Sequence, residues 1–132
     1  MFPAHPVLPS RIDPDFADEE SAARKAGFST GLLSHQAAVA HDRKRIEQSM
    51  RQGAGQAVLY RGWMMSELSW TASYEAMRSR GYAPLIEPSA YAEAHYLPLA
   101  LPYIASMTAK TTFTTGFDFD EAWRAAKRAG CD

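Results

Sequence analysis

The amino-acid sequence predicts an α/β fold: a small Rossmann-like three-layer sandwich with a mostly parallel sheet of four to five strands. Two observations support this prediction. Short apolar runs alternate along the chain with longer stretches of helical character, a spacing typical of right-handed βαβ units. The apolar run at 57–61 is too short for an independent helix and too apolar for a surface strand. We therefore interpret it as a strand that is buried on both faces.

The composition indicates one globular domain over residues 1–132. Apolar residues make up 46% of the chain and charged residues 22%, which disfavours disordered and fibrous proteins. The formal net charge of -1 argues against a dedicated nucleic-acid-binding protein, which usually carries a basic excess on one face. The basic cluster Arg43–Arg45 is diluted by acidic neighbours and is expected to form a solvated helix face.

Cys131 is the only cysteine in the sequence, so no intrachain disulfide can form and a reducing compartment is expected. No segment approaches the roughly 18 consecutive apolar residues of a membrane-spanning helix, and the N-terminus lacks the features of a signal peptide. The sequence therefore predicts a cytoplasmic protein without a membrane association.

The first elements are marked by proline and by acidic residues. Residues 1–9 contain three prolines and predict the end of a strand followed by a loop. A helix is predicted over about 15–26, with Asp13 or Asp15 as its N-cap and Gly27 at its C-terminal end.

The next segments predict a strand and then helical structure. Residues 28–34 form a short strand candidate. Residues 36–52 form either one helix or two pieces. In the second case Asp42 caps the second piece after a break at Ala40–His41.

The buried strand at 57–61 leads into a further helix. This helix is predicted from Ser66, whose hydroxyl can cap it, to Arg80, with Gly81 ending it. Three residues spaced i, i+4 and i+7 are expected to form its core stripe: Trp70, Tyr74 and Met77.

Proline shapes the following segments. Residues 83–86 predict a fourth strand, and Pro88 opens a helix that Pro98 is expected to stop. The segment 97–102 is apolar and interrupted by proline, which predicts an irregular or single-turn structure.

The C-terminal part predicts one strand and one helix. Residues 111–115 are rich in β-branched side chains and predict a fifth, edge strand. The last helix is capped by Asp118 or Asp120 and ends at Gly130. Its apolar face is formed by three residues: Phe119, Trp123 and Ala126.

Arg61 is the first candidate site residue, because it ends the predicted strand at 57–61. Ligands gather at the carboxyl ends of parallel strands, and Gly62 allows a close backbone approach there. A guanidinium at this place suits bidentate capture of an anion. The alternative is a structural ion pair with a helix carboxylate such as Glu67 or Glu87.

Tyr91 and His95 are the second candidate, because a spacing of four places them on one helical face. This polar aromatic pair can orient a ligand carbonyl or carboxylate, and the alternative is a half-buried pair with a structural role. The four histidines are scattered without the spacing of zinc ligands, so no metal site is indicated.

The stretch Gly27–Gly31 matches the G-x-S-x-G pattern of a hydrolase nucleophile elbow, with Ser29 as the nucleophile. That pattern requires a turn from a strand into a helix, whereas here a helix leads into a strand. A small hydrolase that uses Ser29 is therefore the weakest hypothesis. The glycine-rich motifs of dinucleotide and P-loop sites do not occur.

Several stretches together resemble the N-terminal region of bacterial ATP-grasp domain proteins. They are Tyr60-Arg61-Gly62-Trp63-Met64, Ala83-Pro84-Leu85-Ile86, Pro88-Ser89-Ala90-Tyr91 and His95-Tyr96-Leu97-Pro98, and Phe2-Pro3-Ala4-His5-Pro6 is similar to the end of that family's first strand. The resemblance covers nearly the whole chain. It implies the pre-ATP-grasp region, a Rossmann-like domain on the substrate side of the active cleft.

The resemblance also implies which groups come from elsewhere. In the family, ATP and Mg are held by domains that follow this region, and this chain ends at Asp132 before them. Relative to the family, both ends of the chain are expected to be short. The chain would not catalyse alone, because phosphoryl transfer needs cations and metal ions around the phosphates.

Two functions follow as hypotheses. In the first, the chain is the substrate-side domain of an ATP-dependent carboxylate ligase of the ATP-grasp type, with no cofactor of its own. Arg61 would hold the carboxylate-bearing substrate beside Trp63, Tyr91 and His95, and an ATP-binding domain or subunit would act in trans. In the second, the chain is a non-enzymatic interaction module that forms a homo-oligomer or docks a partner through its sheet edge or segment 97–107.

Overall fold

The computed structural model describes residues 1–114 and 116–130. These contain seven α-helices, one 3₁₀ turn and four strands of two residues each. The chain divides into two compact units, Met1–Tyr91 and Ala92–Asp132. The division falls inside one helix, α5 (Pro88–His95).

The strands of the first unit form two short parallel pairs. The strand β1 (Phe2–Pro3) pairs with β2 (Leu32–Leu33), and β3 (Ala57–Val58) pairs with β4 (Ala83–Pro84). Parallel pairing turns the carboxyl ends of both partners toward the same edge.

Two backbone hydrogen bonds connect these pairs. The Met1 amino nitrogen donates to the Leu59 carbonyl oxygen at 2.8 Å, and the Arg61 amide donates to the Met1 carbonyl oxygen at 2.8 Å. In a parallel ladder, the amide and the carbonyl of one residue bond to residues i and i+2 of the neighbouring strand, as Met1 does with Leu59 and Arg61. The segment that follows β3 therefore runs beside the start of β1.

The predicted Rossmann-like three-layer sandwich is wrong, and so is the α/β class. The described residues form an α-rich structure with a minimal sheet instead of four to five strands. Proline is one physical cause: Pro3 and Pro84 occupy the second positions of β1 and β4, where they cannot donate to a neighbouring strand.

The individual strand predictions fail for related reasons. The segment 57–61 is not buried on both faces, since Ala57 is exposed and Leu59 is 51% exposed. Only two residues of each of the predicted strands 28–34 and 83–86 are extended and paired. Residues 111–114 form no strand, and position 115 of that prediction lies outside the described residues.

The first helical segment begins as predicted. The 3₁₀ turn η1 (Pro14–Phe16) is capped by Asp13, whose carboxylate accepts from the Asp15 amide at 3.1 Å, and α1 (Ala17–Lys25) follows directly. Gly27, just beyond α1, has φ +87°, a conformation that glycine adopts without strain.

The segment 36–52 is two helices, α2 (His35–Val39) and α3 (Arg43–Ser49). The break is at His41, whose φ of 54° is left-handed, and Asp42 then caps α3 by accepting from the Arg45 amide at 3.1 Å. The alternative with a capping Asp42 is thus confirmed. A positive φ interrupts a right-handed helix, so the two pieces can turn relative to each other.

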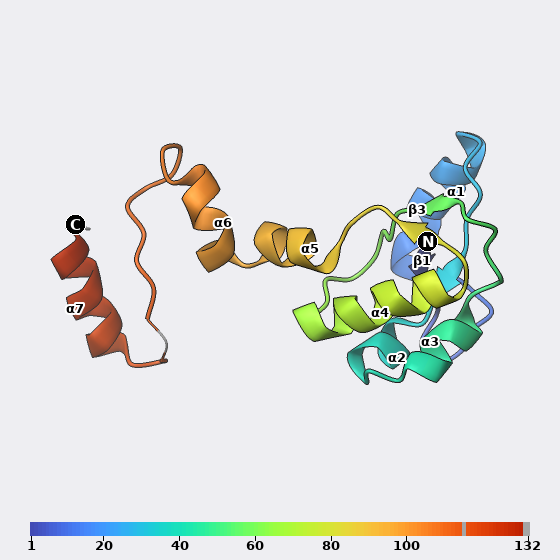
Figure 1. The fold of residues 1–132 in the computed structure, drawn as a ribbon, viewed down its shortest axis with the longest axis horizontal. Helices are drawn as coiled ribbons and strands as arrows, with labels where there is room; N and C mark the ends of the chain where they lie inside the picture. The colour runs from blue at the N-terminus through green and yellow to red at the C-terminus, as the bar shows by residue number, and fades with distance from the viewer. Residues whose placement is uncertain (115, 131–132) are drawn as a thin grey trace. The chain divides into compact units, whose positions relative to one another are not determined.

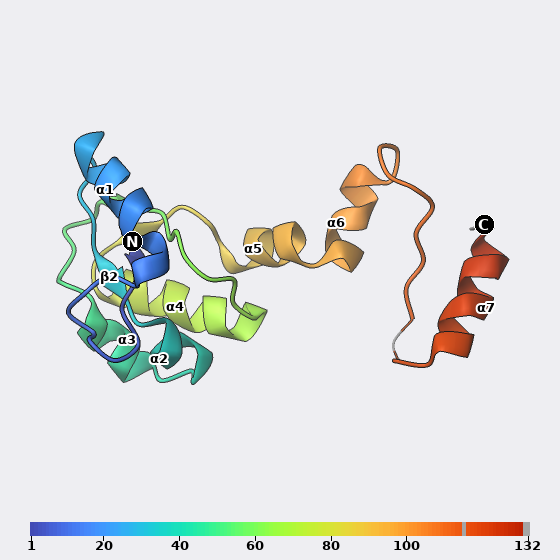
Figure 2. The ribbon, with the colours of Figure 1, turned by 180° about the vertical axis from the view of Figure 1, so that it is seen from behind.

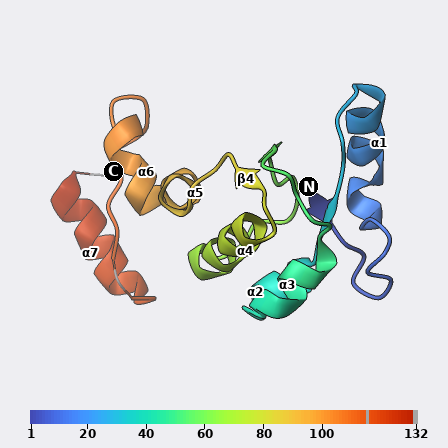
Figure 3. The same cartoon turned by 45° about the vertical axis from the view of Figure 1, so that its right-hand side comes forward.

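The core of the first unit lies between β2, α3 and α4 (Glu67–Ser79). Leu33, Ile46 and Met77, one from each element, are fully buried. Figures 1 and 2 show α2 and α3 beside α4 in opposite views. Figure 3 shows α1 on the other side of the strands from these three helices.

The helix α4 follows its prediction closely. Ser66 caps it by accepting from the Ser69 amide at 3.2 Å, and Gly81 follows it with φ +82°. Trp70 and Met77 of the predicted core stripe are buried, whereas Tyr74 is half-buried. The buried face of α4 also includes Ser69, Ser73 and Ala76.

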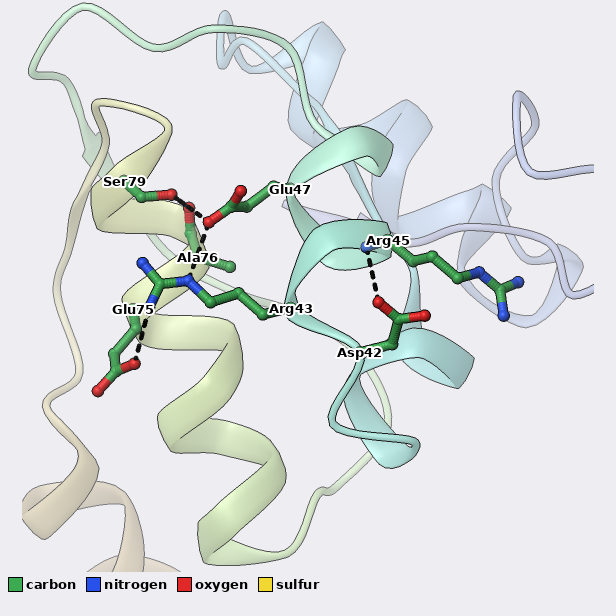
Figure 4. A network of polar contacts seen from close by, with 7 residues as sticks. All are labelled: Asp42, Arg43, Arg45, Glu47, Glu75, Ala76 and Ser79. Atoms are coloured by element: carbon green, nitrogen blue, oxygen red, sulfur yellow. Dashed lines mark hydrogen bonds and ion pairs between the residues drawn. The ribbon is translucent and has the colours of Figure 1, made fainter.

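A polar network joins α3 to α4 at the surface (Figure 4). Arg43 donates to Glu47 at 3.0 Å and to Glu75 at 3.3 Å. Ser79 donates to the Glu47 carboxylate at 2.6 Å, and this hydrogen bond is the main reason why the pKa of Glu47 is lowered. Glu47 therefore connects both helices.

The second unit contains the end of α5, then α6 (Leu97–Ile104) and α7 (Phe119–Ala129). The prediction of irregular structure at 97–102 is wrong: Pro98 occupies the first turn of α6, where proline is tolerated, and Pro102 lies inside the helix. Asp118 caps α7 by accepting from the Asp120 amide at 2.8 Å, which confirms one predicted cap.

Across residues 1–114 and 116–130, no helix combines the length and the apolarity that crossing a bilayer requires.

The α4 core predicts the effect of one substitution. Met77→Ala removes a fully buried side chain and leaves a cavity beside Leu33 and Ile46, so the free energy of unfolding should fall by about 2–5 kcal/mol. Leu68→Ala, on the exposed side of the same helix, is the control and should change it by less than about 0.5 kcal/mol. Urea unfolding measures both, and equal losses would contradict this description of the core.

Candidate functional site

Arg61 lies at the carboxyl end of β3, and an ion pair orients its side chain. Its Nε donates to Oε2 of Glu19 at 2.7 Å and its Nη2 donates to Oε1 at 3.1 Å. This is a bidentate fork between a guanidinium and a carboxylate. The partner is on α1, so Arg61 pairs with a helix carboxylate as the structural alternative predicted, although the residue is Glu19 and not Glu67 or Glu87.

Trp63 extends the same segment onto the turn before α1. Its indole nitrogen donates to the Asp13 carboxylate at 3.0 Å, and its ring meets Phe16 edge to face at a centroid distance of 5.1 Å. The indole hydrogen bond is the main cause of the lowered pKa of Asp13. Trp63 is 42% exposed, so part of its ring remains available as a wall.

The three contacted residues of η1 and α1 are evenly spaced along the chain. Asp13, Phe16 and Glu19 follow one another at intervals of three, which places them on one side of successive turns. Arg61 and Trp63 contact this side from an extended segment. Two distant parts of the sequence thus form one exposed site beside the strand ends.

Gly62 allows the segment to approach its neighbours closely. A Cβ atom there would lie 2.5 Å from Cζ of Tyr60 and 2.6 Å from Cγ of Pro3, both far inside normal contact. With any larger residue, the segment, the Tyr60 side chain or Pro3 would have to shift. Gly62 thus permits a close approach to protein atoms, whereas the predicted approach to a ligand stays a prediction.

Tyr91 is buried below this segment. Its hydroxyl accepts from the Met65 amide at 2.7 Å and donates to the Met65 carbonyl oxygen at 3.2 Å. Its ring stacks on Trp70 at a centroid distance of 4.8 Å. These contacts favour the structural alternative for Tyr91, because its hydroxyl is already hydrogen-bonded to the amide and the carbonyl oxygen of Met65.

His95 belongs to the second unit, whereas Arg61, Trp63 and Tyr91 belong to the first. The His95 side chain is exposed on the last turn of α5 and takes part in an interaction. The structure therefore brings Arg61 and Trp63 together at one surface and places Tyr91 beneath it.

Three residues near the site were missing from the sequence prediction: Asp13, Glu19 and Tyr60. The sequence predicts Asp13 as a candidate helix cap and not as a site residue, because nothing near it in the sequence indicates its hydrogen bond to Trp63. Tyr60 is part of an apolar run, which hides its hydroxyl. Burial raises the pKa of Tyr60, and within the described ranges its hydroxyl makes no hydrogen bond of ordinary geometry.

The geometry supports anion capture and little further chemistry. Ser29 is exposed before β2 and makes no hydrogen bond in the described part of the chain, so a nucleophile elbow is absent there. Residues 1–114 and 116–130 contain no group of three or more His, Cys, Asp or Glu side chains that could hold a metal ion.

Comparison with known proteins found no relative: no family model, no curated protein and no solved structure matches the chain.

The contact between Trp63 and Asp13 predicts a pH effect. A carboxyl whose pKa is lowered by folding adds stability above its unfolded pKa and loses it as the pH falls through the folded value. Trp63→Phe removes the indole donor, so the pKa of Asp13 should rise toward its ordinary value and the acid loss of stability should become shallower. NMR titration of the Asp13 carboxyl carbon measures this pKa.

The matched control is Trp123→Phe on α7, which should leave the Asp13 titration unchanged. An Asp13 pKa that stays low in Trp63→Phe would show that the indole hydrogen bond is not its cause.

Proposed function

We propose that this chain is the substrate-side domain of an ATP-grasp-type carboxylate ligase system and is not catalytic alone. An ATP-binding domain or subunit supplies the nucleotide, the metal and the phosphoryl transfer. The chain supplies Arg61, which holds the carboxylate of the substrate. The resemblance of the sequence motifs motivates the family, and the geometry around Arg61 supports the role.

The supporting observation is the fork between Arg61 and Glu19. Both donors meet both oxygens of one carboxylate at 2.7 and 3.1 Å, which is the geometry that a substrate carboxylate would take. The Arg61 side chain is 62% exposed, so a ligand can reach it from solvent. Glu19 then acts as an internal competitor that a substrate displaces.

In this function, the chain binds the substrate and a partner carries out the phosphoryl transfer. Activation of a carboxylate as an acyl phosphate requires cations and metal ions around the transferring phosphoryl group. The chain contributes orientation: a bidentate arginine fixes the plane of the carboxylate, and Trp63 limits the approach on one side. Its partner carries the reactive groups.

Displacement of Glu19 predicts opposite effects of two substitutions. Arg61→Ala should abolish binding of a small dicarboxylate such as succinate at the Arg61 site, which NMR shifts of the Glu19 and Trp63 amides report. Glu19→Gln should strengthen it about two- to fivefold, because exposed ion pairs contribute about 0.2–1 kcal/mol. Calorimetric titration measures both variants, alone and with an ATP-binding partner and Mg-ATP.

The control is Arg45→Ala, since the Arg45 side chain is exposed on α3 and points away from the α3–α4 network (Figure 4). Unchanged succinate shifts at Glu19 and Trp63 in Arg61→Ala, or weaker binding there in Glu19→Gln, would contradict the assigned role of Arg61.

A second candidate function is the interaction module. Its supporting observation is the exposure of apolar side chains on α6 and α7, neither of which has a buried residue among those described. On α7, Phe119 is 78% exposed and Trp123 52% exposed, and on α6 Tyr103 is 67% exposed. Exposed apolar surface of this kind often marks a site of association.

Self-association through α7 predicts a concentration-dependent mass. Light scattering after size exclusion should show a mass that rises with protein concentration, and Trp123→Ser should lower it. Arg124→Ser, at the adjacent exposed position, should leave it unchanged. A constant monomer mass for the unmodified chain would remove the homo-oligomer from consideration.

A further inference from the structure

A cavity of about 740 Å³ lies in the first unit, and its lining residues differ from those of the Arg61 site. Its walls come from the loop before Asp13, from α1, from β2, from the end of α3 and from the residue before β4. None of Arg61, Trp63, Tyr91 and His95 lines it. It is therefore a separate place at which a ligand can bind.

Arg51 is the charged group of this cavity without an internal partner. It follows α3, and its side chain makes no hydrogen bond or ion pair with any described residue. A guanidinium in a concave surface presents several donors in a fixed plane and no acceptor. This arrangement selects an oxyanion.

Three further polar side chains line the same cavity and are also uncommitted. Ser10, Gln48 and Tyr82 make no side-chain hydrogen bond within residues 1–114 and 116–130. Each carries at least one donor that can add to the guanidinium. An anion here would meet donors from the loop, from α3 and from the residue before β4.

The acidic residue in the wall does not oppose an anion strongly. Glu20 lines the cavity, but its carboxylate accepts hydrogen bonds from Arg24 and Thr30. The bond from the Thr30 hydroxyl is the main cause of its lowered pKa. Glu20 therefore stays ionised, and the adjacent Arg24 offsets its charge.

The open edge of β2 adds a backbone donor. The carbonyl oxygens of Gly31 and Leu33 accept from the Phe2 and Ala4 amides of the β1 segment. Backbone groups alternate in an extended strand, so the Leu32 amide faces away from β1, and Leu32 lines the cavity.

A second cavity provides a contrast. It has about 630 Å³ and contains Arg43, Glu75 and Arg78 on the surface of α3 and α4. Arg43 is bound there by Glu47 and Glu75, and Arg78 lies 6.0 Å from the Tyr74 ring centroid. Its cations are already in contact with protein groups, unlike Arg51.

From these contacts we infer that the cavity beside Arg51 is a binding site for a small oxyanion. The shared chemistry is a carboxylate or phosphate group whose oxygens accept from the Arg51 guanidinium. Gln48, Tyr82 and the Leu32 amide supply the remaining donors. The site is independent of the proposed role of Arg61.

The test is a pair of NMR titrations of the full, ¹⁵N-labelled chain, one with inorganic phosphate and one with succinate. At least one anion should give saturable shifts centred on the amides of Gly31, Leu32, Gln48 and Arg51. Arg51→Ala should weaken this binding at least about tenfold, as expected for loss of charged hydrogen bonds. Arg45→Ala should retain it.

Saturation by phosphate alone or by succinate alone would support the site and define which oxyanion it takes. Shifts that fail to saturate with both anions, or equal affinity in Arg51→Ala, would overturn it. Arg61→Ala should leave these shifts in place. Failure at Arg51 is thus distinguishable from failure at Arg61, whose own shifts centre on Glu19 and Trp63.

Discussion

The exposed site depends on the backbone pairing of Met1 with Leu59 and Arg61. These two hydrogen bonds hold the segment after β3 against the start of β1. The strand β1 is paired with β2, and Leu33 of β2 is part of the core of the first unit, so the segment is held in place relative to that core. Arg61 and Trp63 lie beyond the end of β3, where their side chains contact α1 and the turn before it.

The other end of the same segment is held by a buried side chain. The Tyr91 hydroxyl bonds to both the amide and the carbonyl of Met65, and the Tyr91 ring stacks on Trp70 of α4. The segment 61–65 is therefore fixed at Arg61 by a backbone ladder and at Met65 by a tyrosine. Gly62 lets it lie close to Pro3 between these points. Such fixing orients the Arg61 and Trp63 side chains before any ligand arrives.

Local signals in the sequence predicted the helices better than the sheet. Ser66 is predicted as a cap, Asp42 as the cap of the two-helix alternative, and Asp13 and Asp118 each as one of two candidates, because a cap is a contact between neighbours in sequence. Strand length depends instead on partners that are far apart in sequence. Pro3 and Pro84 lack the amide that a further neighbouring strand would accept from, although the Ala4 and Leu85 amides still bond to β2 and β3. The Leu59 side chain is 51% exposed. The site shows the same division. Arg61 was predicted from its place after a strand, whereas its partner Glu19 is 42 residues away and has no local mark.

The two arginines differ in what a ligand must displace. At Arg61 an incoming carboxylate competes with Glu19, which is intramolecular and therefore always near, but an exposed ion pair contributes only about 0.2–1 kcal/mol and is screened by salt. At Arg51 no carboxylate of residues 1–114 and 116–130 is paired with the guanidinium, yet the guanidinium and its polar neighbours remain hydrated until an anion replaces the water. In the proposed function, the ligand of Arg61 would be a carboxylate that reproduces the bidentate fork of Glu19. Arg51 is less restricted, because nothing in its surroundings already imposes the geometry of one particular anion.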